Sequence, residues 1–187
     1  MALRLLCESD LSLILGWRNT PAVRMSMFST HEISETEHRA WFSRTQENPT
    51  VRWYIYENEQ GTADGVISLT EINEKNRSAF WGFYTNPSAP LGTGTKLGLQ
   101  AMNQAFEVDK FRKLSTEVLA NNEKSLKLHR RLGFREEGIF KEHHLTEAGY
   151  TDVVRFGMLS SEWRIHQPDV LAYISQFNMP GEAFTPE

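Results

Sequence analysis

The spacing of hydrophobic residues changes along the chain, and this change separates helical from extended segments. In the first 50 residues apolar side chains recur at three- and four-residue intervals, as at Leu11, Ile14 and Leu15, which is the period of an amphipathic helix. Ser34 and Glu37 form a capping-box pattern, so a second helix is expected to start there. The first quarter of the chain is therefore predicted to be mainly helical.

A β-rich pattern follows in residues 51–85. Three strands are expected at 52–57, 65–72 and 78–85, joined by polar turns into an antiparallel meander. Gly82 interrupts the third strand and is expected to mark a bulge.

Beyond the meander, helical and extended patterns alternate. The expected elements are helices at 97–106 and 123–132, a strand at 113–119, and a strand pair at 134–140 and 150–160. The fold class is therefore α/β (α+β), a single domain in which helices flank a central mixed sheet. The domain is expected to span residues 1–160. A C-terminal extension at 161–187 is expected to be partly helical, from Asp169 to Phe177, and then loose over the last ten residues.

Composition narrows the class of protein. The 187 residues are 40% hydrophobic, enough for a buried core, which excludes disordered and fibrous proteins. A formal charge of -4 argues against nucleic acid as the main partner. The single cysteine, Cys7, fits a reducing compartment. No apolar run reaches the ~18 residues of a membrane span, and the segment from Met1 to Glu8 turns acidic before a signal-peptide core forms. We therefore expect a cytoplasmic protein.

A glycine loop between the third meander strand and the next helix is the first candidate for chemistry. It runs from Asn86 to Lys96 and contains Gly92 and Gly94. Because these glycines have no side chains, their amides can point into one concavity, and the helix start adds free N–H groups. A pyrophosphate suits such a turn, although an ordinary turn is the alternative. The loop matches neither a P-loop nor a dinucleotide-binding fingerprint.

A second segment begins with Asn122 and ends with Gly133 and Phe134. Together with the glycine loop it resembles the acetyl-CoA-binding motifs of the GNAT superfamily of N-acetyltransferases. These motifs read Gln/Arg-x-x-Gly-x-Gly/Ala and, roughly, Asn-x-x-Ala-x-x-x-Tyr-x-x-x-Gly-Phe. The spacing between the two halves also matches, and the resemblance covers about residues 3–160.

Two departures from the family pattern bear on the predicted chemistry. Ala89 stands at the Gln/Arg position, which puts one loop contact in doubt but leaves the backbone cradle. His129 stands at the tyrosine position. We expect His129 to lie near the sulfur of coenzyme A and to give a proton to the departing thiolate, readily as an imidazolium below neutral pH, whereas a neutral imidazole can still donate one N–H. The alternative is a histidine on a helix surface.

The resemblance implies a GNAT-like sheet whose strands splay around acetyl-CoA, the co-substrate of direct acetyl transfer to an amine. No metal is expected, because the other histidines, His143 and His144 among them, lack partners at ligand spacing. The residues that the resemblance implies for binding acetyl-CoA are Phe83, Tyr84, Thr85, Leu91, Gly92, Thr93, Gly94, Thr95, Asn122, Lys124, Ser125 and His129.

Glu117 is the candidate general base for this reaction. It lies in the strand expected to part from its neighbour around the thioester, and it could remove the ammonium proton through water. The alternative is a solvated carboxylate on a strand. Amides on the strand that ends near Tyr84 could polarise the thioester carbonyl.

The amino-terminal half is similar to a narrower group, the N-acetyltransferases of pseudaminic acid biosynthesis. These enzymes of flagellin glycosylation acetylate the 4-amino group of a UDP-linked aminosugar. The similarity rests on Trp17-Arg-Asn19, the His38-x-x-Trp41 helix and the strand Gly65–Asn73. It implies that Ser68 holds a catalytic water relay, and that the acceptor is bound by Arg18, His38, Trp41, Thr70 and Tyr84. Arg18 would clamp the diphosphate, and Arg24 is a weaker candidate whose alternative is a surface salt bridge. For Trp41 the alternative to stacking on uracil is a place in the core.

Other acceptors and classes stay open at this stage. A ribosomal-protein N-terminus or a polyamine is the alternative substrate within the superfamily. A non-catalytic CoA-binding module is the alternative class. A homodimer is possible for either.

Overall fold

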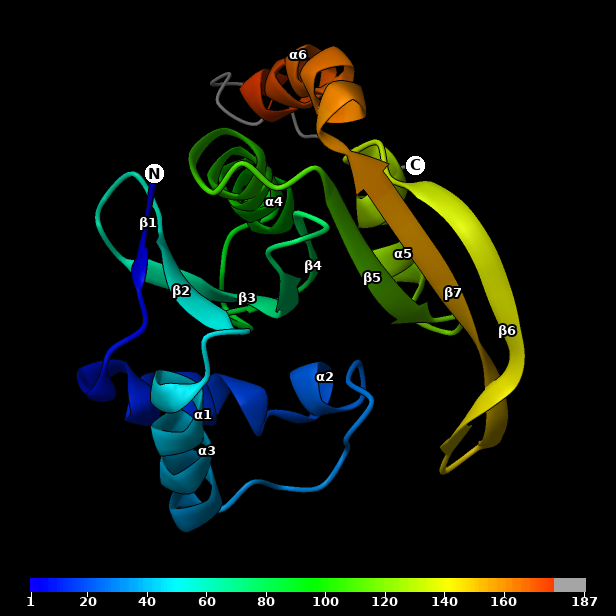
Figure 1. Cartoon of the computed structure of the whole chain (residues 1–187). Coiled ribbons are helices and arrows are strands. Elements are labelled where there is room, and N and C mark those ends of the chain that lie inside the picture. The colour runs from blue at the N-terminus through cyan, green and yellow to red at the C-terminus, as the bar shows by residue number, and fades with distance from the viewer. Residues whose placement is uncertain (177–187) are drawn as a thin grey trace.

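The computed structural model describes residues 1–176 (Figure 1). The elements are β1 (Ala2–Leu5), the 3-10 turn η1 (Glu8–Asp10), α1 (Leu11–Arg18), α2 (Pro21–Arg24), α3 (Glu35–Glu47), β2 (Arg52–Glu57), β3 (Ala63–Asn73), β4 (Ser78–Thr85), α4 (Thr93–Asn103), the π-helical turn η2 (Gln104–Val108), β5 (Lys113–Leu119), α5 (Glu123–Arg131), β6 (Arg135–Thr146), β7 (Gly149–Leu159) and α6 (Ser160–Gln176).

The strands form one seven-stranded sheet in the order β1-β2-β3-β4-β5-β7-β6. Neighbouring strands run antiparallel except β4 and β5, which are parallel. The mixed sheet of a single α/β domain is thereby confirmed.

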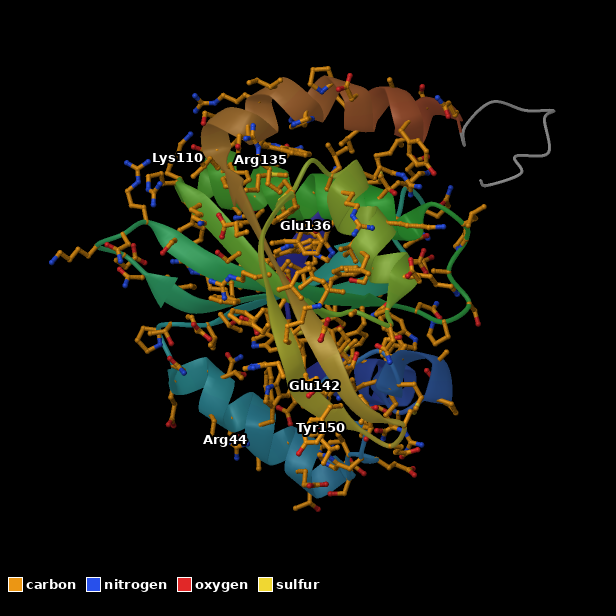
Figure 2. The ribbon with its side chains drawn as sticks, turned by 90° about the vertical axis from the view of Figure 1, so that its right-hand side faces the viewer. Arg44, Lys110, Arg135, Glu136, Glu142 and Tyr150 are labelled. Atoms are coloured by element: carbon orange, nitrogen blue, oxygen red, sulfur yellow. The ribbon has the colours of Figure 1, made fainter. Side chains whose placement is uncertain are left out.

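Helices cover both faces of this sheet. In Figures 1 and 2, α1, α2 and α3 lie below the sheet, whereas α4 and α6 lie above it. Because side chains alternate along a strand, β4 turns Ala79 and Trp81 toward the larger core under α4, α5 and α6. Tyr84 packs on the opposite face, against the smaller cluster that includes Ile14 and Trp17 of α1.

Several local signals in the sequence act as predicted. Ser34 caps α3 by accepting a hydrogen bond from the Glu37 amide at 3.2 Å, and the Glu37 carboxylate accepts one from the Ser34 amide at 2.8 Å. Gly133 follows α5 with a φ of +90°, the left-handed conformation expected of a residue that ends a helix.

Two expectations about the strands are wrong. Gly82 pairs with Ser68 in regular register and makes no bulge; the shift in the β3–β4 ladder lies between Thr70 and Asn73. The final hairpin is also longer than predicted, because β6 continues to Thr146. Most of β6 is an exposed edge with charged residues and two register shifts, so its sequence lacks the apolar alternation by which a strand is recognised.

Helix α6 follows β7 directly and runs through Pro168, so it begins nine residues before the helical segment predicted from Asp169. Its Trp163, Val170 and Ile174 are buried in the larger core, and this packing outweighs the hydrogen bond that proline removes. The predicted loose segment, the last ten residues, lies outside the described residues. Within residues 1–176 no helix has both the length and the apolar character needed to cross a membrane.

Candidate active site

The sheet opens between its two parallel strands. Pairing of β4 with β5 extends only over Ser78–Phe80 and Lys113–Ser115. Beyond these residues β4 continues to Thr85 while β5 continues toward Leu119 with β7 as its partner. The backbone of β4 after Phe80 therefore presents a free edge, on which the predicted acetyl-CoA contacts Phe83, Tyr84 and Thr85 lie.

The glycine turn lies at the start of α4. Gly92 has a φ of +87° and accepts hydrogen bonds through its carbonyl from the amides of Thr95 (3.0 Å) and Lys96 (3.1 Å). The amides of Gly92 and Gly94 donate no hydrogen bond within the described residues. These two donors, at the positive end of the α4 dipole, suit the oxygen atoms of a pyrophosphate. Three further predicted contacts flank them: Leu91 is exposed, whereas Thr93 and Thr95 are buried.

The second half of the motif packs beside this turn. Asn122 caps α5 by accepting a hydrogen bond from the Ser125 amide at 3.1 Å, while Lys124 stands exposed on the first turn of the same helix. A Cβ on Gly94 would touch Leu128 at 3.4 Å, so α5 comes close to the start of α4. The two motif segments, far apart in the sequence, therefore meet at one end of the opening.

His129 is enclosed by aromatic rings and is only 2% exposed. The imidazole stacks on Phe156 at 5.4 Å between ring centroids and meets Trp81 and Phe134 edge-on at 5.2 and 5.3 Å. Nδ1 lies 2.7 Å from the Ser125 carbonyl oxygen, which can only accept, so the ring proton is on Nδ1. Nε2 is buried and has no hydrogen-bond partner within residues 1–176.

This environment corrects the expectation of an imidazolium donor. Burial lowers the pKa of His129 to about 4, although the Ser125 carbonyl acts in the opposite direction. The ring is therefore neutral at pH 7 and its free nitrogen, Nε2, is an acceptor. The alternative of a surface histidine is also wrong, because the side chain lies between α5 and the sheet.

Glu117 projects from β5 and is paired. Arg155 of β7 donates to its Oε1 at 2.8 Å, and the arginine also lies over the Phe80 ring at 4.1 Å. The Glu117 side chain is 30% exposed, so it remains in contact with solvent. Ser68 is buried on β3, which lies on the other side of β4 from β5, with Oγ 3.4 Å from the Gly82 carbonyl oxygen.

The predicted acceptor residues fall into two groups. Arg18 extends from α1 toward Tyr84 of β4. Burial raises the pKa of the Tyr84 phenol, and the positive charge of Arg18 lowers it by a smaller amount. Thr70 is half-buried on β3. His38 and Trp41 instead stack on each other at 4.9 Å, and Trp41 meets Trp53 edge-on at 4.8 Å, which favours the core alternative for Trp41. Burial lowers the pKa of His38.

Some residues at this site escaped the sequence analysis. Arg155 gives no local signal, because its partnership with Glu117 depends on the β5–β7 register. The segment between α2 and α3 also contributes residues that the sequence analysis missed. Phe28 meets His144 of β6 edge-on at 5.1 Å between ring centroids, and the Ser26 carbonyl oxygen accepts a hydrogen bond from the Asn122 side chain at 3.4 Å. The segment thus bridges the hairpin and the start of α5.

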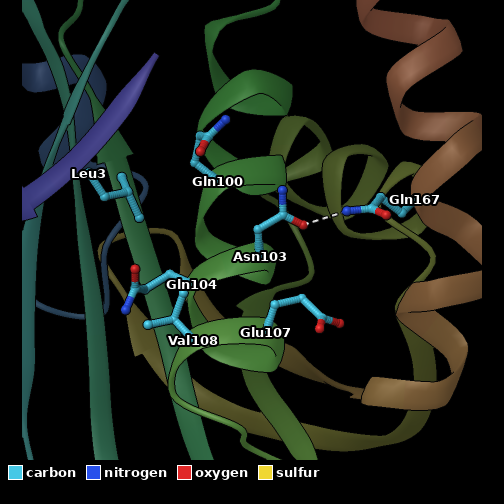
Figure 3. A pocket seen from close by; sticks show the side chains of 7 residues that line it. All are labelled: Leu3, Gln100, Asn103, Gln104, Glu107, Val108 and Gln167. Atoms are coloured by element: carbon cyan, nitrogen blue, oxygen red, sulfur yellow. Dashed lines mark hydrogen bonds between the residues drawn. The ribbon is translucent and has the colours of Figure 1, made fainter.

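A separate hollow of about 370 Å³ lies between β1, the α4–η2 helix and α6 (Figure 3). Asn103 binds Gln167 there at 2.7 Å and Trp163 at 3.0 Å, so its polar groups hold α6 to the helix beneath it. The residues that line it are Leu3, Gln100, Asn103, Gln104, Glu107, Val108 and Gln167. The described residues contain no cluster of three or more histidine, cysteine or acidic side chains placed to hold a metal ion.

Known proteins share this arrangement. A family model described as an acetyltransferase (GNAT) domain matches residues 1–135. The spermidine N(1)-acetyltransferase of Vibrio cholerae is 26% identical over 164 residues, which is 87% of this chain and 95% of that protein. Acetyltransferase PseH of Campylobacter jejuni is 29% identical over 128 residues, 68% of this chain and 78% of that protein. A crystal structure of the Vibrio cholerae spermidine enzyme with CoA and spermine has a TM-score of 0.81 at 26% identity, covering 87% of this chain and 97% of that one.

The chain therefore belongs to the GNAT acetyltransferase family. It is an acetyl-CoA-dependent N-acetyltransferase, with acetyl-CoA as its co-substrate.

Proposed function

We propose that this N-acetyltransferase acts by direct transfer onto the amine of a small molecule, bound on the sheet face that α1 and α2 cover. The observation that carries the proposal is the opening between β4 and β5, which has the free amides of Gly92 and Gly94 at one end. Acetyl-CoA supplies the acetyl group as a thioester. The chain holds its phosphates at the glycine turn and gives it the free edge of β4 to lie along.

Proton transfer falls to residues on the covered face. A neutral amine is the nucleophile, so the ammonium form of the acceptor must first lose a proton. Glu117 takes this proton through a water held near Ser68 in our proposal, while Arg155 keeps the carboxylate in place. His129 is neutral and uses its only N–H on Ser125, so it does not protonate the thiolate. The nitrogen loses its second proton as the amide forms and the carbon–sulfur bond breaks, and in our proposal water passes that proton to the thiolate, which leaves as the free CoA thiol.

The enclosure of this face supports a small acceptor. The bridge from the segment between α2 and α3 to His144 and Asn122 crowds the space that an extended peptide would need. This disfavours a ribosomal-protein N-terminus as the acceptor.

Two small acceptors stand in competition. Spermidine enzymes of Vibrio cholerae and Escherichia coli are among the relatives, so the comparisons support a polyamine better than a sugar nucleotide. A UDP-linked 4-aminosugar remains the substrate that the amino-terminal motifs suggest, with PseH as its relative. The Vibrio cholerae enzyme has a dodecameric structure, and we propose a homo-oligomer here too.

The test follows free CoA thiol release from acetyl-CoA in the presence of spermidine, a UDP-4-aminosugar or a ribosomal N-terminal peptide. We expect release with at least one small amine and little with the peptide. Turnover with the peptide alone would refute the small acceptor. Binding of acetyl-CoA without release for any amine would indicate a non-catalytic module.

A further inference from the structure

A buried carboxylate links the turn between β2 and β3 to the loop that carries the glycine turn. Asp64, near the start of β3, is only 4% exposed. Oδ2 of its carboxylate accepts a hydrogen bond from the Asn58 side chain at 2.7 Å, and Oδ1 accepts one from the Asn86 side chain at 3.4 Å. The carboxylate therefore lies between two asparagines that belong to different loops.

The first of these asparagines, Asn58, organises the turn between β2 and β3. Its side-chain oxygen accepts hydrogen bonds from the amides of Gln60 at 2.9 Å and Thr62 at 3.0 Å. Its backbone amide donates to the Thr62 carbonyl oxygen at 2.9 Å. Because the side-chain oxygen serves the turn, the side-chain NH2 group is left to donate to Asp64. This side of the carboxylate is therefore held by a closed turn.

The second asparagine, Asn86, begins the glycine loop. Its backbone amide donates to the Asp64 carbonyl oxygen at 2.9 Å, so Asp64 contacts this residue through both main chain and side chain. Oδ1 of Asn86 accepts a hydrogen bond from the Ser88 amide at 3.0 Å, and the Asn86 carbonyl oxygen accepts one from the Ala89 amide at 2.9 Å. An asparagine that bonds the backbone two residues on forms an Asx turn, which sets the direction of the chain. The direction in which the loop leaves β4 therefore depends on Asp64.

The contacts between the two loops continue to the start of α4. The Pro90 carbonyl oxygen accepts a hydrogen bond from the Thr93 amide at 3.2 Å, which turns the chain into the helix. Lys96, in the first turn of α4, lies 3.7 Å from the carboxylate of Glu59 in the β2–β3 turn. Asp64, Thr93 and Lys96 line one small hollow of about 220 Å³. The β2–β3 turn therefore lies directly beside the glycine turn.

Helix α4 also packs closely on β3 at the residue next to Asp64. A Cβ on Gly65 would collide with the side chain of Leu97, which is fully buried. The absence of a side chain at this position lets the helix approach the strand. Adjacent residues of β3 thus fix the position of α4 and the path of the loop that leads into it.

A buried carboxylate is suited to this role, although it carries a cost. Taking a carboxylate out of water costs free energy unless well-placed hydrogen bonds satisfy its oxygen atoms. An apolar side chain could pack between the same loops without that cost, but it could not direct an amide group. Since hydrogen bonds depend on angle as well as distance, Asp64 can fix the orientation of Asn86.

We propose that Asp64 is a positioning residue for acetyl-CoA. Through Asn86 it holds the glycine loop in the conformation in which the amides of Gly92 and Gly94 meet the pyrophosphate. This inference rests on the proposed function, which places the phosphates at that turn. Asp64 acts through the loop and does not itself touch the coenzyme. Its loss should therefore weaken the contacts to phosphate and leave the contacts to the pantetheine arm in place.

The first experiment uses Asp64→Asn, which keeps the shape of the side chain and replaces one acceptor oxygen by a donor. One of the two asparagine NH2 groups, on Asn58 or Asn86, would then face another donor. We expect the affinity for CoA to fall at least about fivefold in calorimetric titration. Pantetheine has no phosphate and is measured by its competition with CoA; its affinity should stay within about twofold of wild type.

The matched control is Asp152→Asn. Asp152 also accepts two hydrogen bonds, from the Lys141 side chain and the Glu142 amide, both at 2.8 Å. These contacts lie in the β6–β7 hairpin, away from the glycine loop. The same chemical change there should leave the affinity for CoA unchanged, even where it lowers the melting temperature.

A second experiment restores the contact with its polarity reversed. When Asp64→Asn is combined with Asn86→Asp, the amide at position 64 can donate to the carboxylate at position 86. That carboxylate can still accept from the Ser88 amide. The double variant should therefore regain most of the CoA affinity, whereas Asn86→Asp alone sets two carboxylates against each other and should lose it. Asn86→Ala removes only the donor and should weaken CoA binding as Asp64→Asn does.

Thermal melting shows which variants are folded, and Asn86→Ala serves if Asp64→Asn is not. Equal CoA affinity in wild type and in both single variants would overturn the inference. An equal loss for CoA and pantetheine, or a folded double variant that regains no affinity, would overturn it as well, because either result indicates a general disturbance of the structure. If wild-type protein binds CoA no more tightly than pantetheine, the turn does not hold the phosphates; that result would refute this part of the proposed function, and the inference with it.

Discussion

His129 shows how the surroundings of one residue change its chemistry. At the position where the family pattern has a phenol, this chain has an imidazole held between Trp81, Phe134 and Phe156 with its N–H on the Ser125 carbonyl. Histidine type alone suggests a group that titrates near neutral pH. Burial moves that titration far into the acid range, so the residue acts as a neutral acceptor and packing element.

The low pKa of His129 predicts acid-sensitive stability. Its pKa is about 4 in the folded protein against an ordinary 6.5, so between these values the unfolded chain takes up a proton that the folded chain does not. Its contribution is therefore complete above about pH 6.5 and is lost as the pH falls toward 4, by up to about 3 kcal/mol. His129→Phe should remove most of this slope in urea unfolding measured across the window. An unchanged slope would show that the imidazole is not held neutral.

At the scale of elements, the start of α4 combines a left-handed turn at Gly92 with amides that donate no hydrogen bond within the described residues. Gly92 has a φ of +87°, which a β-branched residue does not adopt without strain, so Gly92→Val should rearrange the turn. Gly149, at the tip of the β6–β7 hairpin, has a φ of +113° and open space around it. Gly149→Val is therefore a matched control, because it forces a side chain into the same left-handed backbone region away from the glycine turn.

Both substitutions should destabilise the fold by about 1–2 kcal/mol, because each forces a side chain into the left-handed region. Only Gly92→Val should weaken acetyl-CoA binding, by about tenfold or more, since it displaces the amides of the turn. Calorimetric titration with acetyl-CoA and urea unfolding provide the two readouts. Equal affinity in the two variants would mean that the turn does not hold the phosphates.

The elements also show which parts of the structure a sequence can predict. The capping box at Ser34 and the helix end at Gly133 depend on contacts a few residues apart, so their pattern is local. The pairing of Glu117 with Arg155 depends on the register of strands separated by a helix and a hairpin. The continuation of α6 through Pro168 depends on burial of Trp163 and Val170 against the core, which overrides local propensity.

The site residues divide in the same way. The two acetyl-CoA motifs are contiguous segments, so the sequence indicated both, and the fold brings them together at α4 and α5. The burial of His129 and the unpartnered nitrogen atoms of Arg18 and Arg24 arise only when three layers are assembled. The sequence therefore predicts which of these side chains can carry a charge, but it predicts neither their protonation states nor their hydrogen-bond partners.

For the whole molecule, the sheet is the element that creates the site. β4 and β5 pair for only three residues each and then separate, while helices close both faces around the opening (Figure 1). The glycine turn follows β4 and α5 follows β5, so the two parting strands bring the two motif segments together at one end of the opening. We therefore propose that acetyl-CoA binds where the parallel pairing stops.

A crystal structure of the protein with CoA tests this claim most directly. We expect the pyrophosphate to accept hydrogen bonds from the amides of Gly92 and Gly94, and the pantetheine arm to lie between β4 beyond Phe80 and β5 beyond Ser115. Density for CoA at another place on the molecule, with the turn free of phosphate, would contradict the account.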